Sequence, residues 1–185
     1  MSISDQLFEG SLIRLAPPDP DRDAAIESQW THDPEYLHLR DSDPARPQSP
    51  GQIRKKYEAA EKDGDKQFLF AIRTRADDRL VGFVKVADIV WNHGNCRLTV
   101  GLGEVADRGQ GYGSETLHLM VRYVFGEMNL HRIGLVTFEY NVAAIRFFER
   151  HGFKVEVRQR QALLRAGRRW DVVWLGLLRQ EWSGR

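Results

Sequence analysis

The sequence predicts an α/β fold in which one mixed sheet carries helices on both faces. Strand-like and helix-like segments alternate through the middle of the chain, and hairpin-like segments flank them. A chain of 185 residues is long enough for one core, so residues 1–185 are expected to form a single domain. The clearest helical segment carries one apolar stripe, formed by Leu117, Met120, Val121, Val124 and Phe125.

The first half of the chain reads as a short strand, two helices and two longer strands. Pro17 and Pro18 stop the first strand, and the Asp33-Pro34 pair breaks the first helix. Residues 41–51 are rich in proline and are expected to form a loop. We expect strands at residues 12–15, 67–73 and 80–91, and helices at residues 21–32 and 52–62.

The second half begins with a turn signal, Asn-His-Gly-Asn, at residues 92–95. Asn141 is expected to cap a helix, and Gly152 is expected to end that helix in a left-handed conformation. A turn at Ala166-Gly167 is expected to close the last hairpin. We expect strands at residues 96–102, 132–140, 153–164 and 170–178, and helices at residues 117–125 and 141–152.

The composition is that of an ordinary globular protein, with 42% hydrophobic and 29% charged residues. A net charge of +1 creates no field that would attract nucleic acid or an anionic membrane. The single cysteine, Cys96, excludes an internal disulfide and a zinc site built from several cysteines. The chain shows neither a signal-peptide core near its start nor an apolar run that could span a bilayer. We therefore expect a cytoplasmic enzyme or binding protein with no metal.

Charge is distributed unevenly along the chain. Residues 1–50 contain ten acidic residues and four arginines, so this segment carries −6 and the remainder +7. Such an acidic segment fits an acceptor site for a cationic amine. The alternative is that these acids lie on solvated helix faces and at helix caps.

The most informative motif is the glycine-rich stretch Arg108-Gly109-Gln110-Gly111-Tyr112-Gly113, between a predicted strand and a predicted helix. Backbone N–H groups at such a turn converge on a small volume that suits a phosphate. Glycine lets the backbone approach an anion closely, and Arg108 adds a charged donor. A P-loop is excluded because it needs a lysine directly after its last glycine, and no lysine lies between Lys85 and Lys154. Residues 101–106 match a dinucleotide fingerprint, but no helix opens within them.

A second segment, from Asn141 to Phe153, follows the next predicted strand. Together with the glycine turn it resembles the GCN5-related N-acetyltransferases (GNATs), in which Arg/Gln-x-x-Gly-x-Gly/Ala holds the pyrophosphate of acetyl-coenzyme A. Here the pattern reads Arg108-x-x-Gly111-x-Gly113. Residues 30–34 (Trp-x-x-Asp-Pro) and 167–171 (Gly-x-x-x-Asp) are similar to motifs of the RimJ/RimL-like branch of that family. The resemblance covers roughly residues 10–180.

The resemblance implies a mixed, mostly antiparallel sheet of about seven strands. It also implies a central splay between two parallel strands, which receives the pantetheine arm. The N–H of Leu102 is expected to face the thioester oxygen, and Gly101 and Gly103 are expected to permit a bulge at the splay. The implied acetyl-coenzyme A site comprises Leu102, Gly103, Arg108, Gly109, Gln110, Gly111, Tyr112, Gly113, Ser114, Asn141, Ala144 and Phe148.

The acid and the base of the implied reaction stay open. In many relatives a tyrosine protonates the leaving thiolate, but its place here falls on Phe148, which has no proton to give. Ser114 and Tyr140 are the candidate acids, although Tyr140 also fits a half-buried strand position. No glutamate occupies the strand before the glycine turn. The candidate bases are therefore Glu104, Glu139, His131 and Asp88.

His32, Tyr36 and Trp91 are expected to line the acceptor site, although such aromatic residues more often belong to a core. The implied activity is transfer of an acetyl group from acetyl-coenzyme A to a primary amine, at a protein N-terminus or on a small molecule. The alternative is an acyl-coenzyme A-binding or sensing module without catalysis. A homodimer is compatible with both the enzyme and the binding module.

Overall fold

The computed structural model describes residues 6–64 and 66–182. One seven-stranded sheet runs through it in the order β1-β2-β3-β4-β5-β7-β6. Neighbouring strands are antiparallel except β4 and β5, which run parallel, so the predicted mixed sheet is confirmed. The strands are β1 (Ile13–Ala16), β2 (Phe68–Thr74), β3 (Leu80–Val90), β4 (Asn95–Leu102), β5 (Arg132–Phe138), β6 (Lys154–Arg165) and β7 (Arg168–Leu178).

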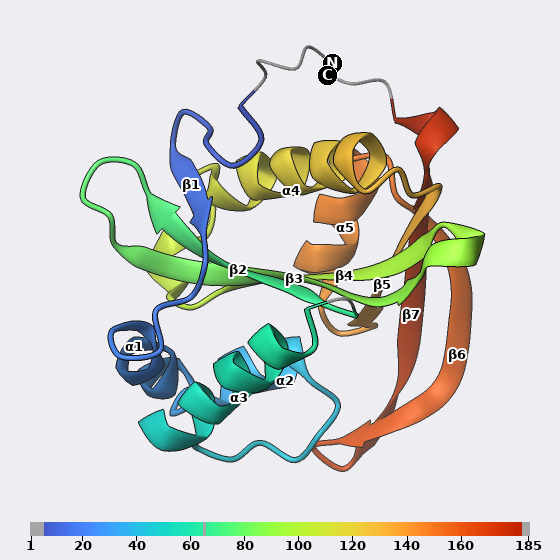
Figure 1. Cartoon of the computed structure of the whole chain (residues 1–185). Helices are drawn as coiled ribbons and strands as arrows, with labels where there is room; N and C mark the ends of the chain where they lie inside the picture. Colours follow the sequence, from blue (N-terminus) through green and yellow to red (C-terminus); the bar gives the residue numbers. More distant parts are fainter. Residues whose placement is uncertain (1–5, 65, 183–185) are drawn as a thin grey trace.

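Helices cover both faces of the sheet, as predicted (Figure 1). One face carries α1 (Asp23–Trp30), α2 (Pro34–Arg40) and α3 (Pro50–Lys62), and the other carries α4 (Tyr112–Arg122) and α5 (Val142–Arg150). A π-helical turn at Tyr123–Glu127 continues α4. Within the described ranges, no helix is both long enough and apolar enough to cross a bilayer.

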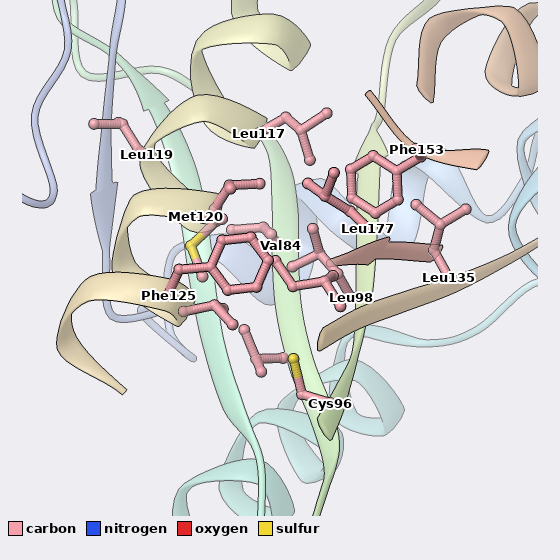
Figure 2. Close-up of a cluster of buried hydrophobic side chains, with 14 of the residues drawn as sticks. Val84, Cys96, Leu98, Leu117, Leu119, Met120, Phe125, Leu135, Phe153 and Leu177 are labelled. Atoms are coloured by element: carbon pink, nitrogen blue, oxygen red, sulfur yellow. The ribbon is translucent and has the colours of Figure 1, made fainter. Parts of the chain in front are cut away.

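The main core forms where the apolar stripe of α4 and its π-helical continuation packs on the sheet. Leu117, Met120 and Phe125 are at most 1% exposed. They lie over Val84 of β3 and Leu98 of β4 (Figure 2). The helical periodicity in the sequence therefore identified the buried face of this element correctly.

Helix α2 corrects the prediction of a simple break at Asp33-Pro34. The Asp33 carboxylate accepts a hydrogen bond from the Glu35 N–H at 2.8 Å, and Pro34 takes the first helical position. A proline is well suited to that position, because its missing N–H has no intrahelical partner there and its fixed φ is already helical. The residues that were predicted to break the first helix thus begin a second one.

The predicted ends of α5 are confirmed. The Asn141 Oδ1 accepts a hydrogen bond from the Ala144 N–H at 3.2 Å, which caps the first turn. Gly152 follows the helix with a φ of 91°, a left-handed conformation that favours glycine. The Asn141 cap fixes the start of α5 directly after the carboxyl end of β5.

The Glu115 carboxylate joins the first turn of α4 to the start of β1 and the residues just before it. It accepts hydrogen bonds at 2.7–2.8 Å from the N–H groups of Ser11, Leu12 and Ile13 and from the Ser11 hydroxyl. The carboxylate fits tightly against Gly10, where an added Cβ would lie 2.2 Å from the carboxyl carbon. Burial acts to raise the pKa of Glu115, but these hydrogen bonds outweigh it and hold the pKa below its usual range.

We expect Glu115→Gln to lower the free energy of unfolding at neutral pH and to leave it unchanged in acid. Because the folded-state pKa is depressed, the stabilisation is complete above the ordinary pKa of 4.5 and is lost as the pH falls through the folded-state value. Urea denaturation of both proteins between about pH 7 and about pH 3 should give stability curves that converge in acid. Curves that stay parallel would contradict this role.

Candidate active site

The central feature of the site is a splay between the parallel strands β4 and β5. These strands pair only where residues 95–97 face residues 132–134. Beyond these pairs, β4 continues to Leu102 along β3, while β5 continues to Phe138 along β7. The carboxyl ends of the two strands are therefore separated, and the predicted splay is confirmed.

The backbone of β4 directs alternate N–H groups into this splay. The Gly103 N–H donates to the Val81 carbonyl at 2.9 Å, so residue 103 faces β3. Because N–H groups alternate between the two sides of an antiparallel strand, those of Val100 and Leu102 point to the side that β5 has left. Leu102 therefore presents an N–H at the mouth of the splay.

Gly101 and Gly103 do not form the predicted bulge, because the β3–β4 register is regular over residues 97–102. They permit close packing instead. A Cβ on Gly101 would lie 2.6 Å from the Phe83 ring, and a Cβ on Gly103 would lie 2.0 Å from the Trp30 ring. The two glycines thus let aromatic side chains pack directly against the open end of β4.

The glycine-rich turn has the backbone conformation that an anion-binding loop needs. Gly109 and Gly111 have φ values of 79° and 89°, a region that favours glycine. Gly111 is the N-cap of α4, and no described side chain caps this helix. The N–H groups of Tyr112, Gly113 and Ser114 therefore lack intrahelical partners and lie at the positive end of the helix dipole. This arrangement fits a phosphate group.

Three residues from different elements meet between the splay and α4. A Cβ on Gly113 would lie 3.6 Å from the Phe147 ring and 3.9 Å from Leu102 Cδ1. The Phe148 ring instead packs on the buried Phe153, with 5.7 Å between ring centroids. Phe147 therefore lies against the start of α4, and the place of Phe148 beside the coenzyme stays a prediction.

Helix α2 spans the open end of the splay. In its first turn, Glu35 accepts a hydrogen bond at 2.9 Å from Arg108, which follows β4. Near its last turn, the His38 carbonyl accepts a hydrogen bond at 2.6 Å from the Tyr140 hydroxyl, which follows β5. An exposed ion pair contributes only about 0–1 kcal/mol, so Arg108 can exchange Glu35 for a phosphate at little cost.

The Arg165 guanidinium, at the end of β6, ties three segments together beside α2. Its Nη1 donates to the His38 carbonyl at 2.9 Å, the Asp41 carbonyl at 3.0 Å and the Tyr140 hydroxyl at 2.8 Å. Its Nη2 donates to the Asp43 carbonyl at 2.9 Å. One guanidinium thus fastens the end of α2 and the loop after it to the β6–β7 hairpin.

The predicted acid Tyr140 has its hydroxyl engaged by these contacts. The Tyr140 hydroxyl donates a hydrogen bond to the His38 carbonyl and accepts one from Arg165. Burial raises the pKa of Tyr140, although the Arg165 charge opposes the shift. This geometry favours a positioning role for Tyr140 over proton transfer, which leaves Ser114 in the first turn of α4 as the other predicted acid.

The candidate bases lie at opposite ends of the splay. Asp88 and His131 lie at the end where β4 and β5 pair, whereas Glu104 and Glu139 follow the separated carboxyl ends. The Glu139 Oε2 accepts a hydrogen bond from the Asp171 N–H at 3.0 Å, while Glu104 is exposed. Placement therefore favours Glu104 among the four.

The three predicted acceptor-site residues do not come together. Trp91 follows β3 and lies at the end where β4 and β5 pair. The whole length of β4 separates this end from Leu102, so Trp91 cannot line an acceptor site at Leu102. Tyr36 is 3% exposed and packs on Trp30, and burial raises its pKa to about 12. His32 is exposed in the turn between α1 and α2. Tyr36 therefore supports the site from within a small core.

Ion pairs and helix caps use most of the acidic residues of the N-terminal segment. Asp23 pairs with Arg73 and Glu27 pairs with Arg40, and both carboxylates are buried. The predicted acidic acceptor surface stays a prediction for the acids that remain exposed, and Asp5 lies outside the described residues. The other engaged acids are Glu9, Asp21 and Glu35 in ion pairs, and Asp19, Asp33 and Asp41 as acceptors of backbone N–H groups. In the part of the chain that the structure describes, no group of three His, Cys, Asp or Glu side chains could hold a metal ion.

Two contributors to the site were not predicted from the sequence. Phe147 lies three residues after Ala144 on the same helix face, so the helical period could have singled it out. Arg165 had no such signal, because the carbonyls it binds lie 122–127 residues away in the sequence.

Comparison with known sequences places this geometry among acetyltransferases. The family model described as "Acetyltransferase (GNAT) domain" matches residues 13–154. The chain is similar to the probable N-acetyltransferase YjcK of Bacillus subtilis, with 33% identity over 92 residues that cover 50% of this chain and 51% of YjcK. It is also similar to the uncharacterized N-acetyltransferase YokL of the same organism, with 27% identity over 68% of each chain. The chain thus aligns with only about half the length of YjcK.

Solved structures with the same fold include two bacterial acetyltransferases. Spermidine N-acetyltransferase from Vibrio cholerae, in complex with CoA and spermine, has a TM-score of 0.82 at 19% identity, covering 93% of this chain and 98% of its own. A GCN5-related N-acetyltransferase from Brucella melitensis has a TM-score of 0.77 at 22% identity, covering 95% and 79%. At these identities the likeness establishes the fold.

Proposed function

The chain belongs to the GNAT family of acetyltransferases, and we propose that it transfers an acetyl group from acetyl-coenzyme A to a primary amine. The observation that carries this proposal is the position of the uncapped N-terminus of α4 beside the splay of β4 and β5. The first feature suits a diphosphate, and the second suits an extended chain that pairs with a strand edge. Acetyl-coenzyme A contains both groups in that order.

In the proposed complex, the N–H groups of residues 109–114 bind the diphosphate and Arg108 adds a charged hydrogen bond. The free edge of β4 near Val100 and Leu102 receives the pantetheine arm. Phe147 and Ala144 border the arm from α5, and Asn141 holds the start of that helix in place.

For the chemistry, the amine attacks the thioester carbon, a C–N bond forms, the C–S bond breaks, and the amine loses a proton. In this proposal the N–H of Leu102 binds the oxygen on which negative charge develops, and such a preorganised donor contributes about 2.7–4 kcal/mol. Glu104, at the open end of β4, takes the proton from the amine. Ser114 is the candidate proton donor for the thiolate, because Phe148 has none to give.

The comparisons suggest an amine acceptor, and its class is part of our proposal. We propose a small amine or a protein N-terminus, and the printed substrate of the Vibrio cholerae enzyme, spermidine, is one candidate. Membership of the RimJ/RimL-like branch is supported by the Asp33 cap before Pro34 and by Asp171, whose Oδ1 accepts a hydrogen bond from the Gln161 N–H at 2.9 Å. A binding or sensing module without catalysis is the second candidate, favoured by Phe148 and by the engaged Tyr140 hydroxyl.

Thiol release from acetyl-coenzyme A tests this proposal directly. The panel contains polyamines, amino acids, amino sugars and a tripeptide with a free N-terminus, and calorimetry measures acetyl-coenzyme A binding in parallel. We expect binding, and thiol release that depends on at least one amine. Binding without release on every amine would favour the sensing module, whereas the absence of binding would contradict both candidates.

We expect Arg165→Met to raise the KM for the acceptor roughly tenfold or more, because the loop after α2 loses its anchor. The KM for acetyl-coenzyme A should change little, since Arg165 contacts neither β4 nor the glycine turn in the described structure. Steady-state kinetics with each substrate varied in turn measures the two effects. Tyr140→Phe removes one of the four Arg165 bonds and the bond from Tyr140 to the His38 carbonyl, and it should show a smaller change of the same kind because three Arg165 bonds remain. Equal rises in both KM values would contradict the role.

A further inference from the structure

The face of the sheet toward α2 carries a lysine near the splay. Val84 and Val86 belong to the core under α4, and side chains alternate along a strand, so Phe83 and Lys85 point to the opposite face. Arg40 of α2 confirms the direction, because its guanidinium carbon lies 5.0 Å from the centroid of the Phe83 ring. Lys85 therefore shares a face with α2 and with the contacts of Arg165.

The position of Lys85 along the strand is near the proposed thioester site. Lys85 pairs in register with Thr99 of β4. Thr99 lies three residues before Leu102, which at a strand rise of about 3.3 Å per residue is about 10 Å of backbone. A small molecule whose amine lies beside the Leu102 N–H would have to span about this length, past the Phe83 ring that packs on Gly101, to reach the Lys85 ammonium.

Two arginines lie close enough to Lys85 to affect its pKa. Burial, and then the charges of Arg40 and Arg97, lower the pKa of Lys85, while Asp41 alone opposes them. The Asp41 Oδ1 already accepts a hydrogen bond from the Asp43 N–H at 3.0 Å. An anion bound beside Lys85 would favour the charged form of its ammonium.

The two neighbouring arginines already have carboxylate partners, whereas Lys85 has none among the described residues. Arg40 forms an ion pair with the buried Glu27 at 3.1 Å, and Arg97 forms an ion pair with Asp88. No ion pair or hydrogen bond joins Lys85 to any other side chain in residues 6–64 and 66–182. Lys85 is thus a half-buried cation with its hydrogen bonds available to a ligand.

We propose that Lys85 binds a carboxylate of the acceptor, so that the substrate is a small amine that also carries a carboxylate. The inference rests on the proposed acetyltransferase function and narrows its acceptor. An ammonium–carboxylate hydrogen bond in a partly desolvated site is stronger than one in water. A polycation such as spermine would instead meet like charge at Lys85, which disfavours it as an acceptor.

The test uses matched pairs of acceptors that differ only in the carboxylate. The probes are unbranched amino carboxylates from glycine to aminohexanoate, each compared with its carboxamide, and spermidine. We expect the wild-type kcat/KM for at least one acid to exceed that for its amide by roughly tenfold. Lys85→Gln should remove this preference, and Lys85→Arg should retain most of it.

A distant lysine supplies the control for overall charge. Lys62, exposed at the end of α3, is replaced in Lys62→Gln, which removes the same charge and should leave the acid-to-amide ratio unchanged. A ratio that Lys85→Gln leaves unaltered would overturn the inference, and so would a wild-type preference for the amides or for spermidine.

A binding measurement separates this inference from the proposed function. In the presence of CoA, the N-acetylated acid should bind more tightly than the N-acetylated amide, and Lys85→Gln should make the two equal. Equal binding by the wild type would overturn the carboxylate site even if the amines are acetylated. If no amine is acetylated but the binding difference is present, the carboxylate site stands and the proposed catalysis fails.

Discussion

Gly111→Glu should weaken acetyl-coenzyme A binding by roughly tenfold or more, because it places a carboxylate where the diphosphate is proposed to bind. Gly111 is the N-cap of α4 and has a φ of 89°, so a side chain at this position stands next to the helix N-terminus. The repulsion acts on the ligand more than on the fold. Calorimetric titration of acetyl-coenzyme A into the variant measures the change in Kd.

Gly111→Ala is the matched control for this variant. It carries the same backbone strain, and its Cβ meets the same neighbour, Leu12 Cδ1 at 2.9 Å, but it adds no charge. The alanine variant should therefore lose less affinity than the glutamate variant when both are folded. If the two lose the same amount, strain explains the effect and the anion site at this turn is contradicted.

Arg73→Ala should lower the free energy of unfolding by about 3–5 kcal/mol, because it leaves a buried carboxylate without its partner. The Arg73 Nη2 lies 2.6 and 2.7 Å from the two oxygens of Asp23, and the side chains are 4% and 0% exposed. The pair joins the start of α1 to β2, on the face of the sheet that α2 also covers. Urea denaturation measures the loss.

The exposed pair of Arg75 and Glu9 provides the comparison. Both of its side chains are 45% exposed, so Arg75→Ala should cost only about 0–1 kcal/mol. Replacing both members of the buried pair, as Asp23→Leu with Arg73→Met, should recover much of the loss. A cost for Arg73→Ala no larger than that for Arg75→Ala would contradict the importance of burial here.

The parts of the fold that follow from local sequence were predicted well. The stripe from Leu117 to Phe125 repeats with the helical period, and that period alone identifies the buried face. Asn141 and Gly152 mark helix ends by side-chain chemistry and backbone freedom, which act within a few residues. The Asp33-Pro34 pair is an equally local signal, but the same two residues can follow a helix or begin one. For this reason α2 was not predicted.

The parts that depend on distant contacts were not predictable in this way. The sequence does not show that a Cβ on Gly103 would meet Trp30, or that Arg165 reaches carbonyls more than a hundred residues away. The acidic count of the N-terminal segment fitted either a cationic substrate or solvated helix faces and caps. That count could not show that Asp23 and Glu27 form buried ion pairs with distant arginines.

The most direct test of the central claim is a crystal structure of the protein with acetyl-coenzyme A. We predict that the diphosphate lies within hydrogen-bond distance of N–H groups from residues 109–114, and that the thioester oxygen lies at the N–H of Leu102. A complex in which the coenzyme occupies another part of the molecule, with this turn contacting no phosphate, would contradict the account.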